Sequence, residues 1–370
     1  MHRRRFLKSA GAGMAGTAVA APALAQGQHP QVRWRMASSF PKSLDTLFGT
    51  AELIAQRVSR LTGGRFEIRV FAAGEIVPPL QVMDAVQNGT VECGQTAGYY
   101  YVGRNPALAF DTALPFGLNA RQQNAWMAYG GGMQLMRELF AQYNIVNFPC
   151  GNTGTQMAGW YRKEIKSVAD LKGLKMRIAG LAGQILERLG VVPQQIGGAD
   201  IYPALERGTI DAAEWVGPYD DEKLGFQKVA KFYYYPGWWE GSAQLSVYVN
   251  AKQWAALPKP YQEALEVACA EANGNMLARY DARNTEALRK LVGAGAQLRA
   301  FPQPVMEACY KVAQDMYAEL SAKNADFKKI YGAWSRFRDE QYLWFRVAEN
   351  TFDNFVYSVK KPAAKSPAAK

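Results

Sequence analysis

Histidine is nearly absent from this chain. The two histidines among 370 residues, His2 and His29, both lie close to the amino terminus. Histidine is the usual residue for activating a serine or cysteine nucleophile, for proton transfer near neutral pH and for binding zinc. No Gly-x-Gly-x-x-Gly loop follows a predicted strand either. These absences argue against an enzyme of these common kinds.

Cysteine is also scarce, and its four residues are widely spaced. Cys93, Cys150, Cys269 and Cys309 include no Cys-x-x-Cys pair, the spacing typical of metal and redox sites. In an oxidising compartment they could form disulfides, but scattered cysteines among apolar residues are more often buried thiols. We expect buried thiols, with disulfide pairing as the alternative.

Long hydrophobic runs are missing as well. A membrane-spanning helix needs about 20 apolar residues, and no such run follows residue 26. The first 25 residues have the pattern of a twin-arginine signal peptide, with basic residues at 3–5 and 8, a short Gly- and Ala-rich stretch at 9–21 and an Ala-Leu-Ala cleavage site at 23–25. That stretch is too short for a membrane anchor. We therefore predict a signal peptide over 1–25 and export to the periplasm by the twin-arginine route.

The formal net charge of +11 is concentrated at the two ends of the chain. Four basic residues lie in the predicted signal and four lysines in the last eleven residues, which leaves about +3 for the body. No basic helix and no basic stripe with interleaved aromatics is evident, so nucleic-acid binding is not expected. A mildly positive body suits the attraction of anionic solutes.

The roughly 345 residues after the signal are too many for one core and indicate two domains. Strand and helix patterns alternate at the start, which predicts an α/β fold with mostly parallel sheets. Two segments, 85–92 and 204–211, each read as a helix, a glycine turn and a strand, and this echo indicates two similar lobes. We expect lobe 1 to comprise 30–149 and about 244–300, and lobe 2 to comprise 150–243.

The carboxy-terminal part of the chain is predicted to be helical. Helical periodicity covers 260–292 and 304–322, followed by an aromatic-rich span at 327–357. The region 303–357 either packs on its own lobes or is covered by a partner subunit, which makes it a candidate dimerisation element. The Pro-, Ala- and Lys-rich tail at 358–370 is expected to be disordered.

Polar and aromatic residues gather where predicted strands end, which is where open α/β sheets bind ligands. Arg177 ends one such strand. An arginine there is often exposed, but an inward guanidinium would need an anion, and its planar fork matches a carboxylate. Glu214 follows another strand among apolar neighbours, and it is either the carboxylate of a salt bridge or, with an amide oxygen such as that of Gln156, a ligand for a hard cation.

Four segments together carry a resemblance to a known family. Residues 151–157, 170–178, 211–215 and 236–241 resemble the solute-binding subunits of tripartite ATP-independent periplasmic (TRAP) transporters, in the branch that binds 2-oxo acids or lactate with a metal ion. The resemblance covers about 30–357. It implies a two-lobed periplasmic binding protein fold of type II with long carboxy-terminal helices, TRAP membrane permease subunits as partners, and a homodimer formed by exchange of a C-terminal helix.

The resemblance also implies roles for single residues. Arg177 would bind the carboxylate of the solute, and Glu240 and Tyr101 would line the pocket. Gln156 and Glu214 would hold a cation, together with the main-chain carbonyl of Trp215. Sodium is expected, with calcium as the alternative. The second pocket arginine of some dicarboxylate-binding relatives is not identifiable here, which favours a small monocarboxylate similar to pyruvate.

Three alternatives remain beside capture of a 2-oxo acid. The solute could be lactate or another 2-hydroxy acid. An exported enzyme could use Glu214 or Glu240 as a base beside a metal-polarised carbonyl, but no nucleophile and base pair can be assembled from these segments. A purely structural protein would leave Arg177 unexplained. We therefore expect a non-catalytic binding protein, with a hinge near Pro149 and Gln244 where the chain crosses between its lobes.

Overall fold

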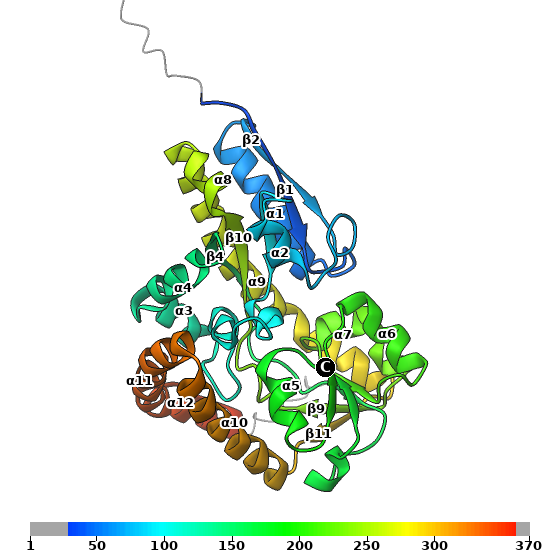
Figure 1. Ribbon diagram of the computed structural model, residues 1–370. Coiled ribbons are helices and arrows are strands. Elements are labelled where there is room, and N and C mark those ends of the chain that lie inside the picture. The colour runs from blue at the N-terminus through cyan, green and yellow to red at the C-terminus, as the bar shows by residue number, and fades with distance from the viewer. Residues whose placement is uncertain (1–28, 360–370) are drawn as a thin grey trace, which may run out of the picture. The chain divides into compact units, whose positions relative to one another are not determined.

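The computed structural model describes residues 29–359. The predicted signal peptide and residues 360–370 of the predicted disordered tail lie outside this range. From Val32 onward the described residues belong to one unit. They form two β-sheets with helices packed on them, so the expected α/β class is confirmed (Figure 1). None of the helices within 29–359 combines the length and apolar character needed to cross a membrane.

The first sheet has five strands in the order β2-β1-β3-β10-β4. Its β1 strand alternates in burial, with Trp34 and Met36 facing the core, as the period of a half-buried strand requires. Strands β1, β2 and β3 are parallel, whereas β10 runs antiparallel to both β3 and β4. The bounds are β1 Val32–Ser38, β2 Phe66–Phe71, β3 Cys93–Thr96, β4 Ile145–Asn152 and β10 Gln244–Asn250.

The second sheet has six strands in the order β11-β9-β5-β8-β6-β7. Strand β6 is parallel to β7 and β8, and β11 is parallel to β9, while β5 is antiparallel to its two neighbours. Both sheets are therefore mixed, whereas we expected mostly parallel ones. The bounds are β5 Trp160–Tyr161, β6 Lys175–Arg177, β7 Val192–Gln194, β8 Ala212–Ala213, β9 Phe232–Tyr235 and β11 Gln297–Ala300.

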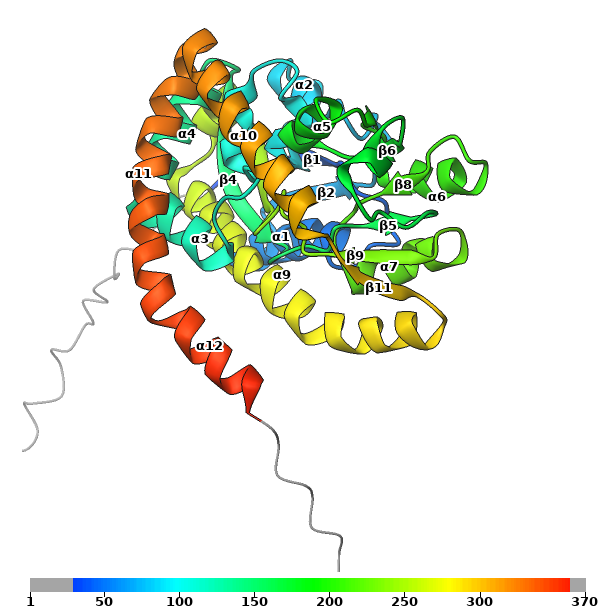
Figure 2. The same cartoon turned by 90° about the horizontal axis from the view of Figure 1, so that it is seen from below.

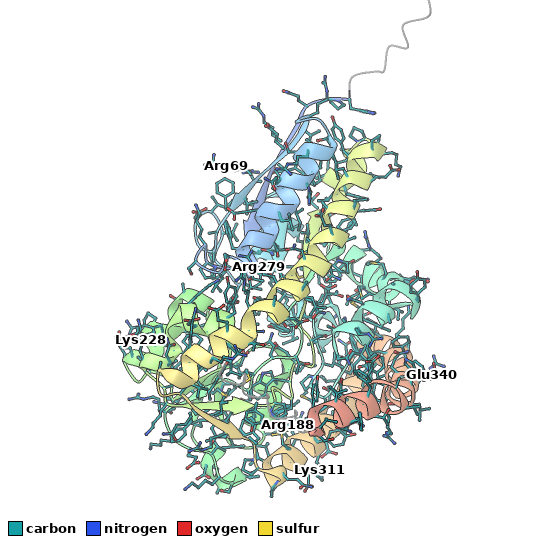
Figure 3. All side chains as sticks on the ribbon, turned by 180° about the vertical axis from the view of Figure 1, so that it is seen from behind. Arg69, Arg188, Lys228, Arg279, Lys311 and Glu340 are labelled. Carbon is teal, nitrogen blue, oxygen red and sulfur yellow. The ribbon has the colours of Figure 1, made fainter. Side chains whose placement is uncertain are left out.

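One predicted lobe boundary is wrong. Residues up to about 300 were assigned to lobe 1, but β11 pairs with β9 in the second sheet. The helix before it, α9 (Lys259–Gly293), has 35 residues and is therefore about 52 Å long. It packs on α1 (Leu47–Leu61) and β4 of the first sheet and on α7 (Pro218–Leu224) of the second part, and Figure 3 shows it extending past Arg279. Because α9 is this long, the chain that follows it reaches the second sheet.

The two echoed segments adopt the same local structure. Helix α2 (Val82–Gln87) leads into β3 and α6 (Gly198–Glu206) leads into β8. Gly89 and Gly208 follow these helices with φ of 73° and 70°, in the left-handed region that favours glycine. The amides of Thr90 and Thr209 then donate to carbonyls of the preceding helices, over 2.8 and 2.9 Å. The echo therefore reflects a repeated helix-to-strand turn in the two parts of the molecule.

Strands β4 and β10 pair with a bulge at the level of the predicted hinge. The register shifts between Leu245 and Ser246, opposite Gly151 and Pro149, so that Cys150 is the extra residue on β4. Bulges bend and twist a strand locally. All four cysteines are buried free thiols, as expected.

The carboxy-terminal helices are α10 (Gln303–Lys323), α11 (Ala325–Val347) and α12 (Glu349–Ser358). The aromatic span predicted as one helix is thus divided at Ala348, whose φ and ψ are −86° and −81°. Helix α11 buries Phe327 and Trp334, and both rings pack against Phe110. Helix α12 buries no residue and continues from α11 at the edge of the molecule (Figure 2).

Further helices connect these elements. Helix α3 begins with a capping box between Asn119 and Gln122, a signal that the sequence analysis did not use. The remaining α-helices are α3 Ala120–Tyr129, α4 Gly132–Ala141, α5 Gly180–Glu187 and α8 Ala251–Ala256, and the 3-10 helices are η1 Gly98–Tyr101, η2 Pro106–Asp111, η3 Val168–Leu171 and η4 Phe226–Lys228.

Candidate functional site

Arg177 lies in the interior of the protein. It ends β6 and is 1% exposed. Its Nη1 donates to the backbone carbonyl of Glu214 over 2.8 Å and also to the Glu214 carboxylate, and its Nε donates to the carbonyl of Ile196 over 3.3 Å. The guanidinium carbon lies 4.9 Å from the ring centroid of Trp215. Of the two interpretations offered by the sequence, an exposed strand residue is thus excluded.

Glu214 faces Arg177 because their strands are neighbours. Strands β6 and β8 are parallel, so Arg177 at the end of one and Glu214 just after the other lie at the same edge of the sheet. Burial raises the pKa of the Glu214 carboxyl, and the charge of Arg177 opposes this rise. Burial is the largest single influence and acts to lower the Arg177 pKa, but the groups around it, Glu214 first among them, together outweigh burial and the net pKa is raised. The pair is therefore a buried ion pair in which burial works against both charges.

Gln156 and Glu240 join this pair from two loops. The backbone amide of Gln156 donates to the carbonyl of Glu240 over 3.1 Å, and its side-chain amide donates to Thr153 Oγ1 over 3.1 Å. Glu240 is buried, and its pKa is raised well above the ordinary value, first by burial and then by the charge of Glu214, against the opposing charge of Arg177. One guanidinium therefore faces two buried carboxyl groups.

Three buried oxygens of this group lack a partner. Gln156 Oε1, Glu214 Oε2 and Glu240 Oε2 accept no hydrogen bond from any described residue. A buried acceptor without a partner costs about 1 to 3 kcal/mol. Carboxylate and amide oxygens are the ligands that hard cations prefer, so these residues fit a cation such as sodium or calcium. The described residues contain no cluster of three or more His, Cys, Asp or Glu suited to a metal, so the ligand set would have to include amide or carbonyl oxygens.

A small cavity lies beside Arg177. It holds about 10 Å³ of space for the centre of a water molecule, which is what one water requires. Tyr99 and Tyr100 contribute from the first sheet's side, and the amide of Gln195 ties the carbonyl of Tyr100 to the other side over 2.9 Å. The lining residues are Phe40, Leu47, Tyr99, Tyr100, Thr153, Gln156, Arg177, Trp215, Val216, Ala243 and Leu245.

The resemblance implied that Glu240 and Tyr101 line this cavity, but Glu240 is not among its lining residues, and neither is Tyr101. Its hydroxyl lies 2.9 Å from Thr96 Oγ1 and accepts from the amide of Met83 over 3.1 Å, so it bonds within the first part of the chain. The three tyrosines lie on the 3-10 helix η1, where successive side chains point about 120° apart. Tyr99 and Tyr100 take the place expected of Tyr101. Sequence reasoning missed Phe40, which follows β1 just as the other candidates follow their strands.

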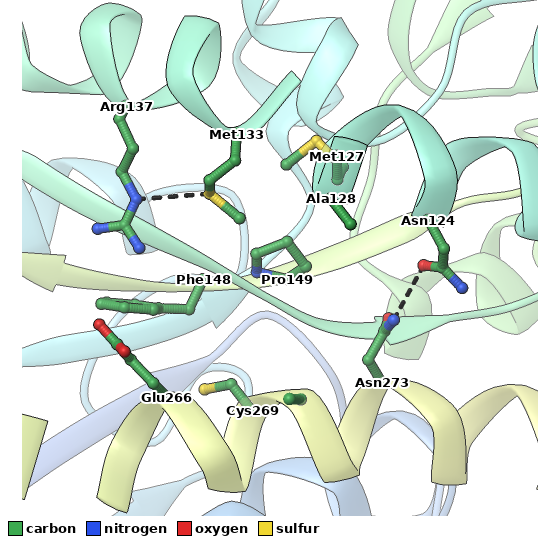
Figure 4. Close-up of a pocket in the computed structure, with 11 residues that line it drawn as sticks. Asn124, Met127, Ala128, Met133, Arg137, Phe148, Pro149, Glu266, Cys269 and Asn273 are labelled. Atoms are coloured by element: carbon green, nitrogen blue, oxygen red, sulfur yellow. Dashed lines mark hydrogen bonds between the residues drawn. The ribbon is translucent and has the colours of Figure 1, made fainter. Parts of the chain in front are cut away.

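A second, larger cavity of about 490 Å³ lies between α3, α4, β4 and α9 (Figure 4). Its walls are mainly apolar, and the guanidinium of Arg137 stacks over Phe148, with its carbon 4.2 Å from the ring centroid. Asn273 donates to Asn124 over 2.9 Å at the other end. No residue predicted for the site lines this cavity. Size alone therefore does not identify the binding site, and the charged group around Arg177 remains the candidate.

Comparisons with known proteins agree with one another. Residues 37–324 match the DctP family, described as bacterial extracellular solute-binding protein, family 7. The chain is 53% identical over 363 residues to a monocarboxylate 2-oxoacid-binding periplasmic protein of Nostoc, covering 97% of this chain and 100% of that protein.

Solved structures of TRAP solute-binding proteins have the same fold. One from Bordetella bronchiseptica has a TM-score of 0.88 and 61% identity, covering 89% of this chain and 98% of that one. It is a mixed-occupancy dimer in which one active site holds copurified calcium and picolinate and the other is apo. One from Pseudoalteromonas atlantica, with bound sodium and pyruvate, has a TM-score of 0.85 and 39% identity, covering 89% and 100% of the two chains.

These matches extend over nearly all of the predicted mature chain, and the solved structures agree with the fold described above. The family consists of receptors that bind a solute for a transporter, which confirms the expectation of a binding protein in place of an enzyme. The chain belongs to family 7 of the bacterial extracellular solute-binding proteins, the solute-binding subunits of TRAP transporters.

Proposed function

We propose that this protein captures a small 2-oxo monocarboxylate of the pyruvate type together with a sodium or calcium ion, for delivery to TRAP permease subunits in the membrane. The observation that carries the proposal is the buried Arg177 beside three acceptor oxygens that have no partner. A guanidinium can bind a carboxylate through two parallel hydrogen bonds. Acceptor oxygens beside it suit a cation, and the relatives from Pseudoalteromonas and Bordetella hold sodium with pyruvate and calcium with picolinate.

The two ligands of these relatives share one chemical feature. In pyruvate the 2-oxo oxygen, and in picolinate the ring nitrogen, lies next to the carboxylate so that both groups can bind one cation. When bound, the cation would supply positive charge to the solute's carboxylate and its adjacent donor atom. In this chain Gln156 and Glu214 would hold it, with the main-chain carbonyl of Trp215. Arg177, which now donates to Glu214, would donate to the solute carboxylate as well.

The cavity favours one carboxylate over two. Arg177 is the one positively charged side chain among the described residues that line it, and its other charged neighbours, Glu214 and Glu240, are acidic. A second carboxylate on the solute would therefore meet no cationic partner and would be repelled by Glu240 where that group is ionised. This supports a monocarboxylate, with Tyr99, Tyr100 and Phe40 forming the walls.

The lobe organisation fits capture by closure. We assign residues 30–149 and 244–296 to lobe 1, and 150–243 with β11 to lobe 2, and we place the hinge at the bulge of β4 and β10. Both lobes contribute to the cavity walls. Because the cavity has room for about one water, even pyruvate requires the lobes to separate before it can enter.

Location and assembly complete the proposal. The pattern at 1–25 supports export to the periplasm by the twin-arginine route. The exposed apolar residues of α12 support a homodimer in which this helix packs on the partner subunit, and the Bordetella relative is a dimer.

The test is calorimetric titration of the purified mature protein with pyruvate. Binding is expected in sodium or calcium and should weaken strongly in sodium-free buffer with a chelator. Because coupling between two ligands is reciprocal, saturating pyruvate should tighten cation binding by the same factor. Lactate serves as the 2-hydroxy comparison and succinate as the dicarboxylate control. If the affinity for pyruvate is the same under all cation conditions, or if succinate binds more tightly than pyruvate, the proposal is wrong. Turnover of pyruvate would identify an enzyme instead.

A further inference from the structure

The carboxy-terminal helix α11 contacts a strained turn in the first part of the chain. The hydroxyl of Tyr342 lies 2.9 Å from the carbonyl oxygen of Phe116 and 3.0 Å from that of Gly117, so its proton is shared between them. Phe116 has a φ of 54°, in the left-handed region that a bulky aromatic residue rarely adopts. Such a conformation costs about 1 to 3 kcal/mol and persists only where surrounding contacts hold it. The Tyr342 hydroxyl is one of those contacts.

The same turn holds the segment that carries Glu240. The amide of Phe116 donates to the carbonyl of Trp238 over 2.7 Å, and the two rings stack at 4.9 Å with an interplanar angle of 14°. The Ser242 hydroxyl donates to the carbonyl of Leu118 over 3.2 Å. The backbones also approach closely, since a Cβ at Gly241 would lie 2.9 Å from that carbonyl oxygen. Residues 116–118 thus fix both ends of the segment 238–242.

That segment reaches the candidate site directly. Glu240 lies between the two anchored positions, and its carbonyl accepts the amide of Gln156 over 3.1 Å. The carbonyl of Gly241 accepts the hydroxyl of Thr155 over 3.0 Å. A shift of the turn at Phe116 would therefore move two residues of the site, the carboxyl group of Glu240 and the loop of Gln156.

We propose that Tyr342 is a positioning residue for the solute site, acting through Phe116 and Trp238 on Glu240 and Gln156. The inference deepens the proposed function and depends on it for the identity of the solute. Tyr342 itself touches neither the cavity nor any residue of the ion pair between Arg177 and Glu214. It holds the Phe116 turn in its left-handed conformation, and this turn then fixes the positions of Glu240 and Gln156.

The first experiment compares Tyr342→Phe with Tyr310→Phe. The Tyr310 ring contacts Phe116 edge-on at 5.1 Å, but its hydroxyl forms no hydrogen bond with any described residue, which makes it a matched control. In calorimetry with sodium, we expect the dissociation constant for pyruvate to rise about three- to tenfold in Tyr342→Phe, as for loss of a hydrogen bond. Tyr310→Phe should bind as the wild type does. Light scattering at the same concentration checks that both variants keep the wild-type oligomeric state.

A double-mutant cycle separates positioning from general destabilisation. Phe116→Gly removes the cost of the left-handed conformation, because glycine adopts it freely. If the Tyr342 hydroxyl acts by holding this turn, Tyr342→Phe should change the pyruvate affinity less than twofold when added to Phe116→Gly. A merely structural role would give the same fold-change in both backgrounds.

A ligand-free readout accompanies the titrations. The long-wavelength band of near-ultraviolet circular dichroism, where tryptophan absorbs and tyrosine does not, reports the stacked tryptophan, and it should change in Tyr342→Phe but not in Tyr310→Phe. Normal pyruvate binding by Tyr342→Phe, or an equal effect of the hydroxyl in both backgrounds, would overturn the positioning role and leave the proposed function standing. Failure of the wild type to bind pyruvate would overturn both.

Discussion

At the scale of single residues, the candidate site holds one buried arginine beside two buried acidic groups. Arg177 donates to Glu214, and Glu240 lies near enough for the Glu214 charge to raise its pKa. Removing one partner of a buried ion pair leaves the other charge without compensation and costs about 3 to 5 kcal/mol of stability. Variants of Arg177 must therefore be judged by folding as well as by binding.

We expect Arg177→Met to lose about 2 to 5 kcal/mol of pyruvate binding free energy, because the solute carboxylate loses its charged partner. The variant should also unfold at a lower temperature, since Glu214 stays buried without its guanidinium. The double variant Arg177→Met/Glu214→Gln should recover stability without recovering binding. Arg188→Met is the control, because Arg188 pairs with Glu319 on the surface. Wild-type affinity of Arg177→Met in calorimetry would remove Arg177 from the site.

The sequence predicted these residues unequally. Arg177 and Glu214 could be placed together because both follow strands of an α/β sheet, and the structure confirms that their strands are parallel neighbours. The direction of Tyr101 could not be predicted, because three consecutive tyrosines on a 3-10 helix face three ways and the sequence does not say which faces the cavity. The contact of Tyr342 with the turn at Phe116 joins residues more than 200 positions apart, and no local sequence pattern predicts it.

At the scale of elements, long periodic segments were predictable and some of the short strands were not. The helix predicted at 260–292 is α9 at Lys259–Gly293, because its apolar period persists over many turns. Strands β5 and β11 have two and four residues, too few for an alternating pattern, and they exist because of the strands beside them. The antiparallel strand pairs of both sheets were not predicted either, because pairing direction depends on long-range contacts.

Helix α7 offers a test of pH dependence. Burial raises the pKa of Asp220 to about 7, helped by the charge of Asp221, although Tyr280 donates to Asp220 over 2.7 Å. The folded protein then binds a proton between pH 4 and 7 that the unfolded chain releases, so this carboxyl group makes the protein less stable as pH rises from about 4 to 7. We expect Asp220→Asn, which keeps an acceptor for Tyr280, to flatten the loss of stability between pH 5 and 8. If the free energy of unfolding depends on pH in the same way in the variant and in the wild type across this range, the assignment is wrong.

At the scale of the whole molecule, α12 buries none of its residues, and Glu349 at its start pairs with Arg121 of α3. Its large side chains are exposed, with Phe352 at 65%, Phe355 at 69% and Tyr357 at 80%. A helix with so much exposed aromatic surface is expected to pack on another molecule.

We therefore expect the full mature chain to be dimeric in light scattering and a chain ending at Ala348 to be monomeric. A chain ending at Val359 is the control and should remain dimeric, because it keeps α12. The aromatic residues of α11, such as Trp334, are already buried on the same chain and should keep the truncated protein folded. A dimer that survives removal of α12 would place the interface elsewhere.

Several contacts join the two proposed lobes. Asp45, which follows β1, accepts from the hydroxyl of Tyr219 on α7 over 3.1 Å and pairs with Lys223, and Gln195 bonds the carbonyl of Tyr100. These contacts link the two proposed lobes, and we expect a solute to enter when they separate. A solute bound between the lobes stabilises the closed form by its higher affinity for that form.

We expect the radius of gyration in solution scattering to decrease when pyruvate and sodium are added together, with tryptophan fluorescence changing in parallel because Trp238 and Trp239 flank Glu240. Arg177→Met at the same pyruvate concentration should show no decrease, because it lacks the contact that favours closure. Asp45→Asn should have a larger radius without solute than the wild type, since the closed form loses its ionic contacts. If the radius stays constant while calorimetry confirms that wild-type sites are filled, the lobes do not close on the solute and entry must occur by local movement of the cavity walls.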